Sequence, residues 1–269
     1  MKTQKTILVP TDFSERANNA LEQAVHLAGK INAKLVIYHV YHRPLAEESH
    51  KFTLTDLEKK IDKQFKQLAD QIPGLKKIPH EFKKELGVSV DNIANKVNNN
   101  GIDMLVMATK GAKGINEIWG TKTAKLIKMI ETPVFVIPDN TSLKHLKKVA
   151  LACDYSLKTE AESIGFLTNL AHELEFSIDV VTLNREEKTM TKSEHANRNE
   201  LIEQMGNVEA SFTFTQHPHI DKGIMDYSKA NNIDAVVILS KNYSFIESLF
   251  HESLTDKMVF NSPIPLMVI

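Results

Sequence analysis

The chain has 269 residues, of which 42% are apolar and 25% are charged. That length and balance are typical of a soluble globular protein with about two domains. Lysine and arginine (33) nearly balance aspartate and glutamate (34), so no basic field favours nucleic acid as a partner. No apolar stretch reaches the roughly 20 residues that cross a bilayer, and the first residues lead into a predicted strand. We therefore expect a cytoplasmic protein that binds neither nucleic acid nor a membrane.

In the first half of the chain, short apolar runs alternate with amphipathic segments. Apolar runs of this kind predict buried parallel strands, and apolar residues at helical spacing predict the helices that cover them. Ser14 stands directly before the first helical pattern, where an N-cap is expected. The predicted strands are 6–9, 34–40, 78–86, 103–107 and 133–137, and the predicted helices are 17–28, 54–72, 89–99 and 121–131.

The second half repeats this order after the polar, turn-forming residues 139–142, where we place a domain boundary. A charged stretch, 185–199, leads into the second of its helices. The predicted strands are 147–152, 178–183, 208–215, 234–238 and 265–269, and the predicted helices are 156–174, one that ends near Gly206, and 221–231.

Short patterns recur at matching places in the two halves. TDFS at 11–14 follows an apolar run, and DYS at 154–156 follows another; GID at 101–103 is matched by NID at 232–234. A fixed order with matching motifs indicates a tandem duplication. We therefore predict two domains, 1–140 and 145–269, each with a five-stranded parallel sheet flanked by helices.

Two turns of the first half are candidates for a ligand site. Ligands of open parallel sheets bind beyond the carboxyl ends of the strands, where loop amides and helix N-termini converge. One turn presents Thr11 and Asp12. The other reads ATKGAKG at 108–114 and continues to Gly120 and Thr121 at a predicted helix start. Glycines let backbone N–H groups approach an anion, and Lys110 and the Thr121 hydroxyl add donors, so the pattern favours a phosphate cradle. The alternative is that the glycines serve only a tight turn.

These residues carry a resemblance to a known family. ILVPTDFS at 7–14, IYHV at 37–40, the glycine loop and TPVFVIP at 132–138 together resemble the universal stress protein family in its tandem two-domain form. The resemblance covers the whole chain. It implies two Rossmann-like domains of the adenine nucleotide alpha hydrolase-like type.

The resemblance also implies an ATP site. In ATP-binding members the fourth-strand loop reads Gly-x2-Gly-x9-Gly-Ser/Thr, and the matching positions here are Ala108, Gly111, Gly120 and Thr121. This sequence departs from the pattern twice. The first glycine is alanine, and eight residues rather than nine separate Gly111 from Gly120, a difference that Gly114 would absorb.

The remaining implied contacts lie at the ends of the first two strands. Asp12 would face the adenine or its ribose beside Thr11, the backbone of Val40 would hydrogen-bond the purine edge, and Thr121 would hold a phosphate. A Mg²⁺ ion accompanying the nucleotide would be held mainly by phosphates and water, with Thr121 as a candidate ligand. Asp12 has a second, compatible interpretation as a helix-capping or Asx-turn residue.

The second half keeps Asp154 but not the cradle. Its loop reads LSKNYSF at 239–245 and ends at Glu252, with no glycine at a cradle position. Each added Cβ obstructs the approach of a phosphate, and like charges about 4 Å apart cost about 1–4 kcal/mol at a surface-like dielectric, so Glu252 would repel the triphosphate. We expect ATP only in the first domain, and a structural or partner-binding role for the second.

No catalytic or metal-binding residues are predicted. The sequence lacks GxxxxGK[ST], SGG and HxGH motifs, so we expect at most slow ATP hydrolysis. The pairs His39 with His42 and His217 with His219 lack an adjacent third ligand, and a single cysteine, Cys153, excludes an internal disulfide.

Three functional hypotheses remain: an ATP-dependent binding or regulatory module of the stress response, a scaffold of the same fold that binds no nucleotide and, ranked last, an enzyme acting on an adenylated small molecule. The third needs a general acid or base, for which Asp12 and His39 are the nearby candidates. Single-domain relatives dimerise through their fifth strands. The resemblance therefore implies an internal pseudo-dimer through 133–137 and 265–269, in a monomer or a homodimer.

Overall fold

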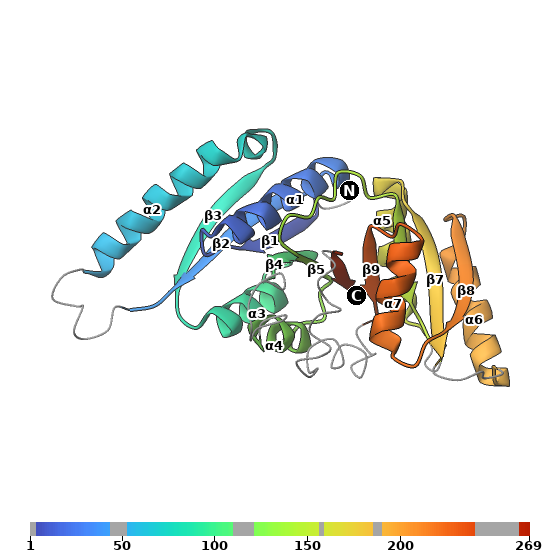
Figure 1. Ribbon diagram of the computed structural model, residues 1–269. Coiled ribbons are helices and arrows are strands. Elements are labelled where there is room, and N and C mark those ends of the chain that lie inside the picture. The colour runs from blue at the N-terminus through green and yellow to red at the C-terminus, as the bar shows by residue number, and fades with distance from the viewer. Residues whose placement is uncertain (1–3, 44–52, 110–120, 156–158, 185–189, 240–263) are drawn as a thin grey trace. The chain divides into compact units, whose positions relative to one another are not determined.

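The computed structural model describes residues 4–43, 53–109, 121–155, 159–184, 190–239 and 264–269 (Figure 1). The chain forms two compact units. Of the described residues, those from 4 to 109 and from 122 to 140 belong to unit 1, and Thr121 and those from 141 to 269 belong to unit 2. No helix among the described residues is long and apolar enough to cross a bilayer.

Unit 1 is a five-stranded parallel sheet in the order β3-β2-β1-β4-β5. The chain builds outward from β1 to β3 and then returns to the other side of β1, so the strand order reverses between β1 and β4. Central strand residues such as Ile7, Leu8 and Leu105 are fully buried. The strands are β1 (Thr6–Pro10), β2 (Lys34–Tyr41), β3 (His80–Leu86), β4 (Met104–Ala108) and β5 (Val134–Ile137).

Helices cover both faces of this sheet, as expected for parallel strands joined by crossovers. α1 (Glu15–Ile31) and α2 (Leu54–Gln71) lie on one face, and α3 (Ser89–Asn99) and α4 (Thr121–Met129) lie on the other (Figure 1). A short 3₁₀ helix, Pro73–Lys77, follows α2. Ser14 caps α1 as predicted, because its Oγ accepts a hydrogen bond from the Ala17 N–H at 3.3 Å.

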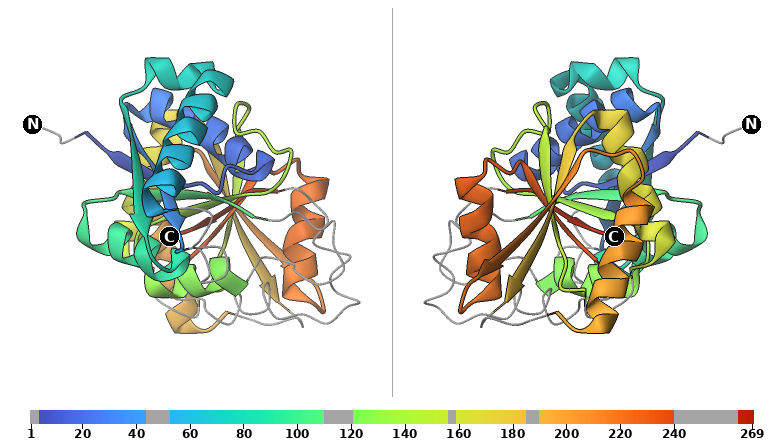
Figure 2. Two further views of the ribbon diagram at one scale, coloured as in Figure 1. Left: turned by 90° about the vertical axis from the view of Figure 1, so that its left-hand side faces the viewer. Right: turned by 90° about the vertical axis from the view of Figure 1, so that its right-hand side faces the viewer.

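Unit 2 repeats the strand order, as β10-β9-β6-β7-β8. In Figure 2, α7 lies on one face of the sheet and α5 and α6 lie on the other. The predicted fold class, an α/β chain with helices on both sides of parallel sheets, is confirmed. The elements are β6 (Lys148–Ala152), α5 (Ala161–Leu174), β7 (Ser177–Asn184), α6 (Lys192–Met205), β8 (Ala210–Gln216), α7 (Ile220–Ala230), β9 (Ala235–Ile238) and β10 (Leu266–Val268).

Matching backbone details support the internal repeat. Phe13 and Tyr155, each directly after the repeated aspartate, both have a left-handed backbone with φ of 63° and 56°. The repeated aspartates before β4 and β9 also act alike. Asp103 accepts the N–H of Thr6 at 2.7 Å, and Asp234 accepts the N–H of Lys148 at 2.9 Å.

The predicted start of the first helix of unit 2 is wrong. The sequence predicts a helix over 156–174, but α5 begins at Ala161, and Glu160 occupies the N-cap without a side-chain hydrogen bond. Thr159 lies before the helix and donates its hydroxyl to Gln204 of α6 at 3.0 Å.

Candidate functional site

The carboxyl ends of β1 and β2 in unit 1 bring together several of the predicted site residues. Thr11 follows β1, and its N–H donates to the Tyr38 carbonyl of β2 at 2.9 Å. On the other side of β1, Thr109 follows β4 and donates its N–H to Ile137 at 3.0 Å. Both threonines are buried, and they stand where the strand order reverses. Such a switch point is the usual ligand-binding position in open α/β sheets.

Side chains organise the turn from β1 into α1. Thr11 Oγ1 accepts the N–H of Phe13 at 3.0 Å, and Asp12 Oδ1 accepts the N–H of Ser14 at 3.0 Å. The Asx-turn interpretation of Asp12 is therefore confirmed. The Asp12 side chain is otherwise exposed at the start of α1, where the helix dipole favours an anion.

An aromatic cluster stands beside this turn. The Phe13 ring lies 4.6 Å from the His39 ring and 5.2 Å from Phe65 of α2, measured between centroids. His39 Nδ1 lies 2.7 Å from the Thr11 carbonyl oxygen. Because a carbonyl only accepts, Nδ1 carries the proton in this contact, which fixes the ring orientation. Phe65 was missed by the sequence analysis, since nothing in its amphipathic helix marks it as different from a core residue.

Val40 has backbone groups that no described residue satisfies. In β2, the Lys34 N–H donates to the Lys5 carbonyl, and the Tyr38 carbonyl accepts the N–H of Thr11. The even-numbered residues of β2 therefore turn their backbone N–H and C=O groups toward β1. Val40 is the next even residue, but β1 has ended there, and the Thr11 carbonyl contacts His39 instead. The N–H and C=O of Val40, a half-buried residue, thus lack a described partner. Unpaired backbone groups of this kind call for a ligand or water.

The second predicted turn is described only at its two ends. Ala108 is the last residue of β4, half-buried and in register with Ile137 of β5. Thr121 is the first residue of α4. The predicted cradle residues between them lie outside the described residues: Lys110, Gly111, Gly114 and Gly120.

The corresponding end of unit 2 is filled by its own side chains. Tyr155, which corresponds to Phe13, is 1% exposed, and Leu183, which corresponds to Val40, is buried. Helix α7 packs closely there, because a Cβ added at Gly223 would overlap Leu183 and His217. The loop on which we based the loss of ATP binding in this half, 239–253, lies outside the described residues except for Leu239.

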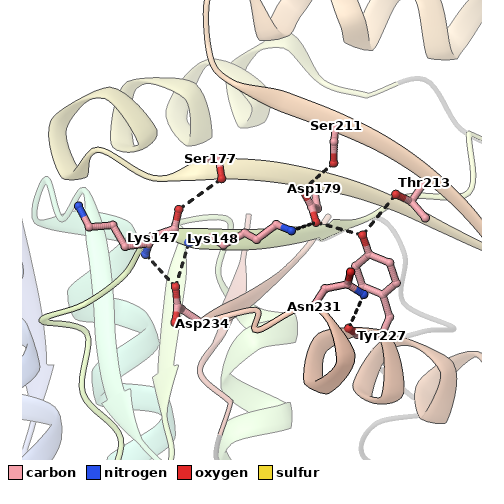
Figure 3. A network of polar contacts seen from close by, with 9 residues as sticks. All are labelled: Lys147, Lys148, Ser177, Asp179, Ser211, Thr213, Tyr227, Asn231 and Asp234. Atoms are coloured by element: carbon pink, nitrogen blue, oxygen red, sulfur yellow. Dashed lines mark hydrogen bonds and ion pairs between the residues drawn. The ribbon is translucent and has the colours of Figure 1, made fainter.

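A second polar cluster lies within unit 2, toward the amino ends of its strands (Figure 3). Asp179 of β7, whose side chain is 6% exposed, is 2.8 Å from Lys148 Nζ. It also accepts hydrogen bonds from Ser211 at 2.6 Å and from Tyr227 of α7 at 3.0 Å. Tyr227 has a further contact with Thr213 at 3.3 Å. Every polar group in this cluster has a partner inside it.

The cluster shifts the pKa values of its members. Burial alone would raise the pKa of Asp179, but hydrogen bonds from Lys148, Ser211 and Tyr227 outweigh burial and hold that pKa below its usual range. The hydrogen bond to Asp179 raises the pKa of Lys148. The sequence signal for this cluster was a lone acidic residue inside an apolar strand, which the sequence analysis did not use. A fully satisfied ion pair under a helix indicates a structural role.

Comparison with known proteins decides the family. The universal stress protein family model matches residues 4–138, which is 135 of the 269 residues. The chain belongs to the universal stress protein family. Universal stress protein A homolog 1 of Coxiella burnetii is 26% identical over 141 residues, which cover 49% of this chain and 95% of that relative. A universal stress protein of Methanocaldococcus jannaschii is 26% identical over 157 residues, which cover 51% and 97%.

A solved structure extends the likeness to the whole of this universal stress protein. The crystal structure of a universal stress protein from Archaeoglobus fulgidus DSM 4304 matches with a TM-score of 0.72 at 17% identity, over 98% of this chain and 97% of that one. The two chains therefore share the fold along their full length, and the family resemblance predicted from the sequence is confirmed.

Proposed function

We propose that this universal stress protein binds ATP at the carboxyl ends of β1 and β2 in unit 1. The observation that carries the proposal is the unpaired N–H and C=O of Val40 beside Thr11 and Asp12. One backbone donor and one acceptor on the same residue complement the acceptor and donor on the edge of an adenine ring. Pairing them with a base would satisfy groups that otherwise cost free energy when desolvated.

The surroundings of Val40 suit a nucleoside. The Phe13 and His39 rings supply an apolar surface for a base, as binding pockets commonly do. Asp12 uses Oδ1 to hold the Ser14 N–H, which leaves Oδ2 to accept a hydrogen bond from a ribose hydroxyl. Asp12 would thus keep its structural role while binding the sugar.

We assign the phosphates to the glycine segment that precedes α4. Lys110, Gly111, Gly114 and Gly120 would supply amide and ammonium donors, and Thr121 would stand at the positive end of α4. A Mg²⁺ ion would be held mainly by phosphate oxygens and water, with Thr121 as a protein ligand. This segment needs a direct test, because Ala108 and the shorter spacing distinguish it from the family pattern.

The protein would then act as a nucleotide-dependent binding or regulatory module of the stress response. Unit 2 would be the structural or partner-binding half, since side chains fill its corresponding end. A cytoplasmic location, at most slow ATP hydrolysis and the pairing of 133–137 with 265–269 stay predictions, as do the domain limits 1–140 and 145–269.

Calorimetric titration with ATP and Mg²⁺ tests the proposal. Gly111→Asp should abolish binding, because it adds a side chain and a negative charge to the cradle. Asp12→Ala should weaken binding more than Asp12→Asn, since asparagine still accepts the Ser14 N–H. Asn242→Asp and Asp154→Ala are the matched controls in the second half and should bind as the unmodified chain does. No detectable heat at millimolar nucleotide would overturn the proposal and favour the scaffold hypothesis.

A further inference from the structure

The two edge strands of the repeat differ in charge. In unit 1, the edge strand β3 reads HEFKKEL and forms ion pairs, including Lys84 with Asp62 at 2.7 Å. In unit 2, the edge strand β8 reads ASFTFTQ and contains no charged side chain. The matching registers place Phe214 where unit 1 has Lys84. Charged residues protect an edge strand against pairing with another chain, and β8 lacks that protection.

The backbone of β8 presents free polar groups on its outer side. Among the described strands, β8 pairs only with β7. The Ile178 N–H donates to the Glu209 carbonyl, which fixes the alternation of the parallel ladder. Odd-numbered residues of β8 therefore face β7. Even-numbered residues turn their N–H and C=O outward, and these are Ala210, Phe212, Phe214 and Gln216.

The side chains hold β8 in place and leave one aromatic ring exposed. The Arg198 guanidinium of α6 lies 5.1 Å from the centroid of the Phe212 ring, and Ser211 and Thr213 are bound by Asp179 and Tyr227 on the other face. Phe214 is nevertheless 46% exposed. The strand is thus an ordered edge with a phenyl group available for contact.

The sequence of β8 reads almost the same in both directions about Thr213. Phenylalanine flanks Thr213 on each side at 212 and 214, and a hydroxyl residue follows on each side at 211 and 215. In an antiparallel pair of identical strands centred on Thr213, phenyl groups lie opposite phenyl groups and hydroxyls opposite hydroxyls. Cross-strand pairs of both kinds stabilise a sheet.

The backbone alternation permits this register. Phe212 of one copy lies opposite Phe214 of the other, and both turn their polar groups outward, so they form a hydrogen-bonded pair. Thr213 lies opposite itself as a pair without hydrogen bonds, consistent with its polar groups facing β7.

We propose that β8 is a self-association edge, through which two copies of this chain pair antiparallel about a two-fold axis at Thr213. A second copy is the occupant because the strand complements itself in side-chain type and in hydrogen-bond alternation, and no charge on β8 opposes the pairing. The proposal is independent of nucleotide binding, which we propose for the other unit.

Sedimentation velocity of the full chain from about 1 to 100 μM tests the association. The unmodified protein should shift with concentration toward twice its 30.3 kDa mass. Phe214→Lys should lower the dimer fraction at least about tenfold, because it copies the unit 1 residue and places two ammonium groups diagonally across the axis. Val88→Lys, an equal change at a residue 58% exposed in unit 1, should have no effect. A monomer at 100 μM, or a Phe214→Lys protein that still dimerises, would overturn the proposal.

Oxidative cross-linking tests the register. Thr213→Cys should give a disulfide-linked dimer, because Cα atoms of opposite residues without hydrogen bonds are about 4.5 Å apart and thus within disulfide range. Thr215→Cys is the matched control and should not cross-link, since it lies opposite Ser211 instead of itself. Cys153 is buried and should not contribute. Equal cross-linking of the two variants would reject the register, and circular dichroism would show that both are folded.

Discussion

Lys148 Nζ lies 2.8 Å from Asp179 Oδ2, at positions where the repeat in unit 1 has Thr6 and Val36. The two side chains are unequally buried, with 35% of Lys148 and 6% of Asp179 exposed. Unit 2 has thus exchanged a hydroxyl and an apolar side chain for an ion pair under α7 (Figure 3). Thr6 and Val36 therefore indicate which residues to introduce in place of Lys148 and Asp179.

Removing the two partners should have unequal effects on stability. Lys148→Thr leaves a buried carboxylate without its cation and should lower the free energy of unfolding by about 3 kcal/mol. Asp179→Val leaves a lysine that still reaches water and should cost about 1–2 kcal/mol. The double variant has no unpaired charge but still leaves Ser211 and Tyr227 without the Asp179 acceptor, so its loss should be smaller than the sum of the two single losses. Urea denaturation of the four proteins measures this cycle, and additive losses would contradict it.

The contact between Lys148 and Asp179 should also make the free energy of unfolding depend on pH in the acid range. The folded pKa of Asp179 lies below its ordinary value of 3.8, so its contribution is present above about pH 4 and is lost as the pH falls through the folded pKa. The loss caused by Asp179→Val should therefore be constant from pH 5 to 7 and smaller at pH 3. Urea denaturation at each pH measures it. A difference that does not change with pH would mean that folding does not shift the pKa of Asp179.

Most of the fold followed from local patterns in the sequence. Buried strands such as β1 and β9 are short, apolar runs with clear limits. The internal repeat then predicts the equivalent strand in the other half of the chain. The start of α5 could not be predicted, because Glu160 at its N-cap makes no side-chain hydrogen bond and thus gives no local capping signal. A capping residue in the sequence indicates only the local hydrogen bonds of one helical turn, not the contacts with distant residues.

The residues of the candidate site were predictable to a similar degree. Asp12 and Thr11 follow a recognisable strand and turn, and Val40 came from the family resemblance. The unpaired backbone groups of Val40 could not be read from its sequence, because they depend on where β1 ends beside β2. The contact between Phe65 and Phe13 could not be predicted either, because it depends on the position of α2 against the turn after β1.

Cys153 should be inert in the folded protein. The thiol is 6% exposed, and burial raises its pKa to about 11. At pH 8 only about one thiol in a thousand is then ionised, and the thiolate is the reactive form. Labelling with a chromogenic disulfide reagent should be slower than in urea by on the order of 100-fold. Rapid labelling of the native protein would show instead that the turn after β6 opens readily.

The ends of α1 and α5 offer a stabilising substitution with a control inside the same chain. Both helices end in a left-handed residue, Asn32 with φ of 51° and Glu175 with φ of 60°. Asparagine tolerates this conformation, whereas glutamate pays a steric cost that glycine removes. Glu175→Gly should therefore raise the free energy of unfolding by about 1 kcal/mol, and Asn32→Gly by less than about 0.5 kcal/mol. Urea denaturation monitored by circular dichroism measures both. A larger gain at Asn32 than at Glu175 would show that side-chain contacts of Glu175, rather than its backbone conformation, control the end of α5.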